Sequence, residues 1–109
     1  MFELNASMMC ANFGNLEKEV KELDKAGIDS FHIDIMDGRY VGNFAMSLYD
    51  MAYIASATTT PLDVHLMIER PIRYVDAFCK AGSSILTLHV EADTQENTLE
   101  ALRRIRENG

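Results

Sequence analysis

The sequence predicts a parallel α/β fold built from repeated strand–helix units. Apolar stretches of strand length alternate along the chain with segments of helical period, which favours parallel βα units over a helix bundle or a sandwich. The segment Lys25-Ala26-Gly27 and the strand after it recur 55 residues later as Lys80-Ala81-Gly82 and its strand. Two βα units therefore make one repeat, and eight units would need about 220 residues, close to the ~250 of a (β/α)₈ TIM barrel. Residues 1–109 are expected to form the N-terminal half of a single TIM-barrel domain.

The first unit is predicted from a strand-length stretch and a helical stretch that ends in glycine. Residues 4–9 are expected to form a strand, and residues 16–26 place Leu16, Val20 and Leu23 on one helix face. Gly27 ends this helix, because glycine readily adopts the left-handed conformation found just after helices.

The second unit combines a strand over residues 31–36 with a helix that begins after a loop. The segment Ser47-Leu48-Tyr49-Asp50 resembles a capping box, in which a serine and an acidic residue three positions later satisfy free backbone N–H groups. The helix is expected to run to residue 57, and Pro61 blocks its continuation.

The third and fourth units follow the same alternation. A strand over residues 62–67 leads to a helix from Pro71 to residue 81, with Gly82 as its stop. A strand over residues 85–90 precedes an amphipathic helix that starts at Thr94 and ends at residues 108–109. Its inward face is expected to carry Leu99, Leu102 and Ile105.

Four parallel strands alone would leave two strand edges unpaired and one sheet face uncovered. The chain is therefore expected to have a complement. This could be a C-terminal half of a longer protein, or a second copy in a homo-oligomer.

Composition excludes several classes of partner. The formal net charge is −7 and the Lys and Arg residues are scattered, so a nucleic-acid partner is not expected. No apolar run approaches the roughly 20 residues of a membrane span and the N-terminus does not resemble a signal peptide, which predicts a cytoplasmic protein without a membrane partner. Cys10 and Cys79 lack CxxC spacing and are expected to be reduced thiols.

Polar side chains share one face of the predicted sheet. Because side chains alternate along a strand, His32, Asp34 and Met36 lie opposite Phe31, Ile33 and Ile35. The same alternation groups further polar or sulfur-containing residues on this face of the other strands: Asn5, Ser7 and Met9, then Asp63, His65 and Met67, then Thr87 and His89. In (β/α)₈ barrels this inner face carries the active site near the carboxyl ends of the strands.

Two imidazoles and a carboxylate on neighbouring strands predict a metal site. His32, Asp34 and His65 offer ligands suited to Zn²⁺, Fe²⁺, Mn²⁺ or Co²⁺, and Asp34 beside a cation could also transfer a proton. The alternatives are hydrogen-bonded core histidines, or a solvent-facing antiparallel sheet.

Three other features have both a structural and a functional interpretation. Met8, Met9, Met36 and Met67 are either core residues or an apolar lid over a reactive intermediate. Asp37-Gly38 with Gly42-Asn43 is either a mobile rim or a plain turn. Cys10 is not expected to be a nucleophile, because a catalytic cysteine needs an activating base.

Four segments resemble the ribulose-phosphate 3-epimerase family. They are His32-Ile33-Asp34-Ile35-Met36-Asp37-Gly38, Leu62-Asp63-Val64-His65-Leu66-Met67, Ser7-Met8-Met9-Cys10-Ala11-Asn12-Phe13 and Leu88-His89-Val90-Glu91-Ala92. The resemblance covers nearly the whole chain. The Ser-x-Met-Cys form of the first-strand segment is more similar to the allulose-6-phosphate 3-epimerase branch.

The resemblance implies a metal-dependent isomerase that inverts carbon 3 of a ketose phosphate, as between ribulose 5-phosphate and xylulose 5-phosphate, by removing and returning a proton through an enediolate. His32, Asp34 and His65 would bind the divalent metal and Asp34 would be a catalytic acid/base. Ser7 and His65 would contact the substrate, and Met36 and Met67 would line its pocket.

The sequence departs from the family pattern at Arg39-Tyr40-Val41-Gly42-Asn43, where the family usually has His-Phe-Val-Pro-Asn. The family's second catalytic Asp and its phosphate-binding loops belong to later strands, and neither Asp63 nor Asp93 can be assigned to that Asp. Two other functions stay open. One is another metal-dependent barrel lyase or aldolase, whose Schiff-base version is disfavoured because no predicted strand face carries a lysine; the other is a non-catalytic half-barrel that self-associates.

Overall fold

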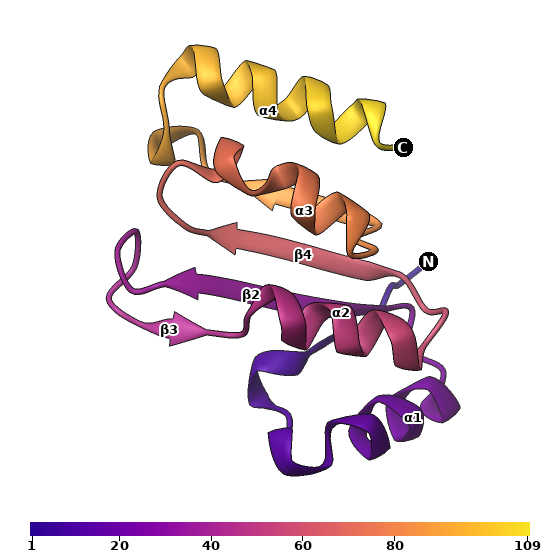
Figure 1. Cartoon of the computed structure of the whole chain (residues 1–109). Helices are drawn as coiled ribbons and strands as arrows, with labels where there is room; N and C mark the ends of the chain where they lie inside the picture. The colour runs from indigo at the N-terminus through magenta and orange to yellow at the C-terminus, as the bar shows by residue number, and fades with distance from the viewer.

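A computed structural model describes residues 1–109, and its sheet follows the predicted parallel order. The strands β1 (Asn5–Ser7), β2 (Ser30–Asp37), β4 (Leu62–Met67) and β5 (Ile85–Leu88) lie side by side in the order β1-β2-β4-β5. Each is parallel to its neighbours. Figure 1 shows the arrows of β2 and β4 pointing the same way across the middle of the molecule.

Each parallel strand is followed by a helix. The α-helices are α1 (Leu16–Ala26), α2 (Leu48–Ala57), α3 (Val75–Lys80) and α4 (Gln95–Glu107), and the short 3₁₀ helices are η1 (Met8–Cys10), η2 (Phe13–Asn15), η3 (Pro71–Arg73) and η4 (Val90–Ala92). This alternation makes four βα units, so the predicted α/β fold is confirmed.

The core lies between the helices and one face of the sheet. The buried strand residues are Phe31, Ile33 and Ile35 of β2 and Leu62, Val64 and Leu66 of β4. The helices cover them with Val20, Met51, Ile54, Val75, Phe78 and Ala101. Burial of these apolar side chains is the main source of stability. It leaves the alternating polar residues on the opposite face.

Two predicted helix boundaries are confirmed in detail. The Ser47 side chain accepts from the Asp50 backbone N–H, and the Asp50 carboxylate accepts from the Ser47 N–H, forming the expected capping box. Gly27 follows α1 with φ 81°, the left-handed conformation that glycine adopts without a Cβ clash.

Several boundaries differ from the predictions. The first strand ends at Ser7, because residues 8–10 turn into η1, and the last strand ends at Leu88. The helix expected from Pro71 to residue 81 is divided into η3 and α3. A short strand, β3 (Phe44–Ala45), was not predicted; it pairs antiparallel with the end of β2.

The predicted inward face of α4 is wrong for two leucines. Leu99 is 60% exposed and Leu102 is 42% exposed, whereas Thr98 and Ala101 are buried and Ile105 packs against the core. Residues 98, 101 and 105 share one face at helical spacing. We attribute this choice of face to the small Ala101 and Thr98, which let the helix approach its neighbours closely.

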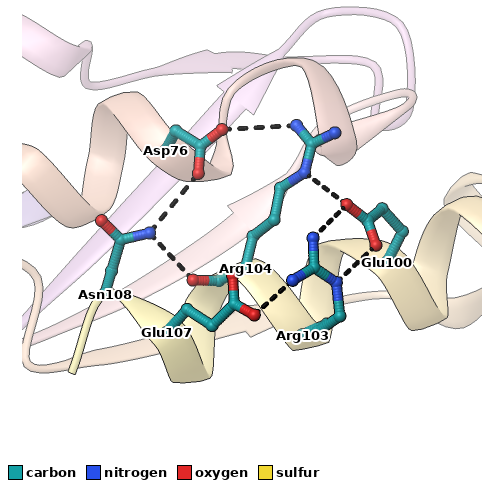
Figure 2. A network of polar contacts seen from close by, with 6 residues as sticks. All are labelled: Asp76, Glu100, Arg103, Arg104, Glu107 and Asn108. Atoms are coloured by element: carbon teal, nitrogen blue, oxygen red, sulfur yellow. Dashed lines mark hydrogen bonds and ion pairs between the residues drawn. The ribbon is translucent and has the colours of Figure 1, made fainter.

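Polar side chains join α4 to α3 (Figure 2). The Arg104 guanidinium donates to Glu100 at 2.9 Å and to Asp76 of α3 at 3.3 Å. Arg103 pairs with Glu100 on its own helix. Hydrogen bonds from Arg103 and Arg104 lower the pKa of Glu100 to about 2.

The two cysteines are free, as predicted. None of the helices combines the length and the apolar character that a membrane crossing requires.

Candidate metal centre

The register between β2 and β4 brings the polar residues together. Asp34 pairs with His65, and His32 pairs with Asp63. Within each strand these residues alternate with the buried Ile33 and Val64, so their side chains leave the sheet on the face opposite the core. The sequence alternation that predicted this grouping is therefore confirmed.

His32, Asp34 and His65 converge on one point. Each offers one ligand atom, and these atoms lie within 4.8 Å of one another. The Asp34 Oδ1 atom lies 3.1 Å from His32 Nε2 and 3.3 Å from His65 Nδ1. The three side chains are partly buried, with exposures of 29%, 14% and 24% in chain order.

The outward nitrogen of each imidazole also has a partner. His32 Nδ1 lies 2.9 Å from Asp63 Oδ2, and His65 Nε2 lies 2.7 Å from His89 Nε2. Histidines that bind metals usually hold their second ring nitrogen in such a hydrogen bond, which fixes the tautomer and orients the ring. The donor set and its surroundings therefore fit a divalent cation that accepts nitrogen and carboxylate ligands.

The carboxylates control the charge of His32. Burial lowers the pKa of His32, but the hydrogen bond that His32 makes to the Asp63 carboxylate and the charges of Asp34 and Asp63 outweigh burial and raise the pKa above its ordinary value. A proton and a cation compete for the same nitrogen. The two carboxylates thus favour positive charge at this point, whether it is carried by a proton or by a metal ion.

The other predicted site residues surround this cluster at different depths. Ser7 pairs with His32 in the register of β1 and β2 and is exposed. Met36 and Met67 pair with each other at the carboxyl ends of β2 and β4 and are partly buried. Met8, in contrast, is 1% exposed and belongs to the core, which supports the core interpretation for that residue.

The loop after β2 forms an ordered turn built on Asp37. Its carboxylate accepts backbone N–H groups from Arg39, Tyr40 and Glu69 at 2.7–2.9 Å. The hydroxyl of Tyr40 in this turn donates to Glu91, which follows β5. That hydrogen bond lowers the pKa of Glu91 and raises the pKa of Tyr40.

Sequence reasoning did not identify Asp37, Tyr40 and Glu91 as a connection between loops. The Asp-Gly pair at residues 37–38 was the available signal for a turn. Tyr40 and Glu91 are 51 residues apart, and no periodicity relates them.

Parallel βα units with a His–Asp cluster on the polar face of adjacent strands, below their carboxyl ends, define an α/β protein of the kind that holds its functional site toward those strand ends. The comparison with known families agrees with this class. Residues 3–109 match the Ribulose-phosphate 3 epimerase family, and the chain belongs to that family.

Curated relatives carry the same name. The chain is 45% identical over 92 residues to the ribulose-phosphate 3-epimerase of Bacillus subtilis, covering 84% of this chain and 42% of that protein. It is 42% identical over 103 residues to the enzyme of that name from Synechocystis, covering 94% and 45%. A chloroplastic ribulose-5-phosphate-3-epimerase of Arabidopsis thaliana is 38% identical over 102 residues, covering 94% and 35%. The chain spans less than half the length of these relatives.

Proposed function

We propose that the protein containing this chain is a metal-dependent 3-epimerase that interconverts ribulose 5-phosphate and xylulose 5-phosphate. Residues 1–109 would supply the first four βα units of a (β/α)₈ barrel, and further units would complete the cylinder and contribute the phosphate-binding loops. The observation that carries the proposal is the convergence of His32, Asp34 and His65 in a chain of this family.

His32, Asp34 and His65 would hold the divalent cation. Zn²⁺, Fe²⁺, Mn²⁺ and Co²⁺ all accept two imidazoles and a carboxylate. When bound, the cation would stabilise the negative charge that develops on the substrate oxygens as the proton leaves carbon 3.

Asp34 would serve as one of the two acid/base groups. Its Oδ1 atom faces the two imidazoles, and a carboxylate in this position can accept the carbon-3 proton on one face of the substrate. Inversion needs a second acid/base group on the opposite face. We place that group on the later strands, as in the family pattern.

Four residues would form the substrate side of the site. Ser7 can donate a hydrogen bond from its exposed position at the end of β1, and His65 lies on the same face of the sheet, on β4. Met36 and Met67 would exclude water from the enediolate, because a dry apolar surface strengthens the electrostatic interactions that stabilise it.

The names of the relatives favour a pentose phosphate over allulose 6-phosphate. Family membership likewise favours epimerisation over a lyase or aldolase reaction. The motif in the first strand that resembles the allulose-6-phosphate branch is one short segment.

Hydrogen exchange at carbon 3 tests the proposal. The protein at its full natural length, loaded with Co²⁺ or Zn²⁺, is incubated with ribulose 5-phosphate in D₂O and followed by NMR. We expect deuterium at carbon 3 and formation of xylulose 5-phosphate. Asp34→Asn should lower the rate by about 10²–10⁴-fold, the usual contribution of a general base.

Glu22→Gln is the matched carboxylate-to-amide control, since the Glu22 side chain on α1 is 63% exposed. It should leave the rate unchanged. Exchange with allulose 6-phosphate alone would replace the pentose assignment with the hexose one. No exchange with either sugar would reject the epimerase assignment.

A further inference from the structure

His89 lies directly behind one of the three candidate ligands. Its Nε2 atom is 2.7 Å from His65 Nε2, and its Nδ1 atom is 3.5 Å from Glu91 Oε1. Glu91 also accepts the hydroxyl of Tyr40. The contacts therefore run from the loop after β2, through Glu91 and His89, to His65.

Ring packing restricts the orientation of His89. Its ring centroid is 4.9 Å from that of His65, with an interplanar angle of 36°. The Tyr40 ring centroid is 5.1 Å away, at 33°. The His89 imidazole thus packs against two rings, and each of its nitrogens faces a partner.

The proton positions in this chain of contacts follow from counting. A neutral imidazole has one N–H donor and one acceptor nitrogen. If His65 Nδ1, the atom that faces Asp34, is to bind a cation, the His65 proton must be on Nε2. His89 Nε2 then has to accept the hydrogen bond that His65 Nε2–H donates. The His89 proton therefore lies on Nδ1 and faces the Glu91 carboxylate.

We propose that His89 is a positioning residue that holds His65 in its Nε2–H tautomer and fixes the ring so that Nδ1 is presented to the cation. Glu91 and Tyr40 in turn orient His89. This inference rests on the metal site of the proposed function. It extends that function by connecting the loop after β2, where the sequence departs from the family pattern, to the candidate ligand His65 through His89.

Titration with Co²⁺ alone tests the role of His89 without requiring turnover. Affinity is measured by calorimetry and ligand geometry by the visible absorption of bound Co²⁺, with the protein at its full natural length. His89→Leu removes the acceptor and should weaken Co²⁺ binding by about 10–100-fold, as is typical when the partner of a ligating histidine is lost. It should also change the Co²⁺ spectrum.

His89→Gln is the rescuing variant. Its carboxamide oxygen can accept from His65 Nε2–H, and its NH₂ group can donate to Glu91, so affinity and spectrum should return to within about threefold of the unaltered protein. Thr87→Val is the matched control: Thr87 is paired with His65 in the register of β4 and β5, but its hydroxyl forms no hydrogen bond. It should leave Co²⁺ binding unchanged.

A measurement on the unaltered protein avoids dependence on variants that fail to fold. Long-range ¹H–¹⁵N NMR of the Zn²⁺-loaded protein should show His65 bound through Nδ1 and protonated at Nε2. Zn²⁺ on Nε2 overturns the inference, and so does equal Co²⁺ affinity in all variants or a Gln variant as weak as the Leu variant. Failure of the unaltered protein to bind Co²⁺ would instead overturn the proposed metal site, and this inference with it.

Discussion

Asp37 shows how one side chain can define the geometry of a loop near the site. It accepts two N–H groups within its own turn and one from Glu69 after β4. It therefore ties together the carboxyl ends of β2 and β4, the two strands that carry the candidate metal ligands.

Asp37→Asn should lower the free energy of unfolding by about 1–2 kcal/mol. The amide can replace only one of the carboxylate oxygens, so the Glu69 N–H would face an NH₂ group and lose its acceptor. Urea unfolding at pH 7 measures the change. Glu22→Gln, at an exposed position of α1, is the control. An equal change in the free energy of unfolding of both variants would contradict this role for Asp37.

The same carboxylate predicts a pH dependence. Burial raises the pKa of Asp37, but backbone hydrogen bonds from Glu69, Arg39 and Tyr40 outweigh burial, so the pKa in the folded protein lies below its ordinary value of 3.8. Its contribution to stability is therefore complete above the unfolded pKa and is lost as the pH falls through the folded pKa. The difference in stability between the unaltered protein and Asp37→Asn should shrink over that acidic range.

At the residue scale, strand alternation was enough to predict which site residues share a face of the sheet. The contacts between loops could not be predicted from the sequence. His32, Asp34 and His65 share a face because side chains alternate along β2 and β4 and the strands pair in register. The hydrogen bond between Tyr40 and Glu91 depends on how two loops approach each other, and no local spacing encodes that.

Among the elements, α4 shows the limit of an apolar pattern. Its leucines predicted the buried face, but the helix buries Thr98 and Ala101 and exposes Leu99 and Leu102. The apolar pattern of a helix indicates roughly which side faces the core. How closely the helix packs against its neighbours decides which residues at the edge of that side are buried. The capping box of α2 and Gly27 after α1 were predictable, because they depend only on neighbouring residues.

Ala101→Leu tests the observed orientation of α4. Ala101 is fully buried, so the added atoms should lower the free energy of unfolding by about 1–3 kcal/mol through overpacking. Arg106→Leu introduces the same side chain at an exposed position of the helix and should have little effect. Thermal unfolding of both variants distinguishes the faces, and the opposite ranking would show that α4 is rotated.

The ion pairs of Glu100 with Arg103 and Arg104 on the surface of α4 predict a second pH effect. Because the pKa of Glu100 falls from 4.5 to about 2 in the folded protein, Glu100 stabilises the fold above about pH 4.5 and ceases to do so as the pH falls through about 2. Glu100→Gln should flatten the dependence of the melting temperature on pH in this range. The effect should be small and should decrease at high salt, because the groups are at the surface.

For the whole molecule, the exposed apolar residues at the sheet edges and on α4 indicate where another polypeptide segment could pack. The edge strand β5 exposes Ile85 (56%), and Leu99 and Leu102 are exposed on α4, the last helix of the chain. At the other edge Leu4, just before β1, is 64% exposed. An unpaired strand edge beside apolar side chains favours pairing with another chain. Periodicity could predict four βα units, but not which residues a complement would cover.

The chain of residues 1–109, produced alone, should therefore self-associate. Sedimentation velocity at micromolar concentration should show dimers or larger species, and replacing Leu99 and Leu102 by Gln should shift them toward monomer. Tyr49→Gln is the control, because Tyr49 is 85% exposed on α2, away from both edge strands.

In the protein at its full natural length, the same changes at Leu99 and Leu102 test whether further βα units cover α4. If further βα units cover α4, the two Gln residues should lower the melting temperature, because burying an unpaired amide costs stability. If α4 stays exposed there, the melting temperature should not change. A monomeric isolated chain, together with an unchanged melting temperature in the longer protein, would show that this surface is free in both, and would remove the physical reason for placing these four units in a closed barrel.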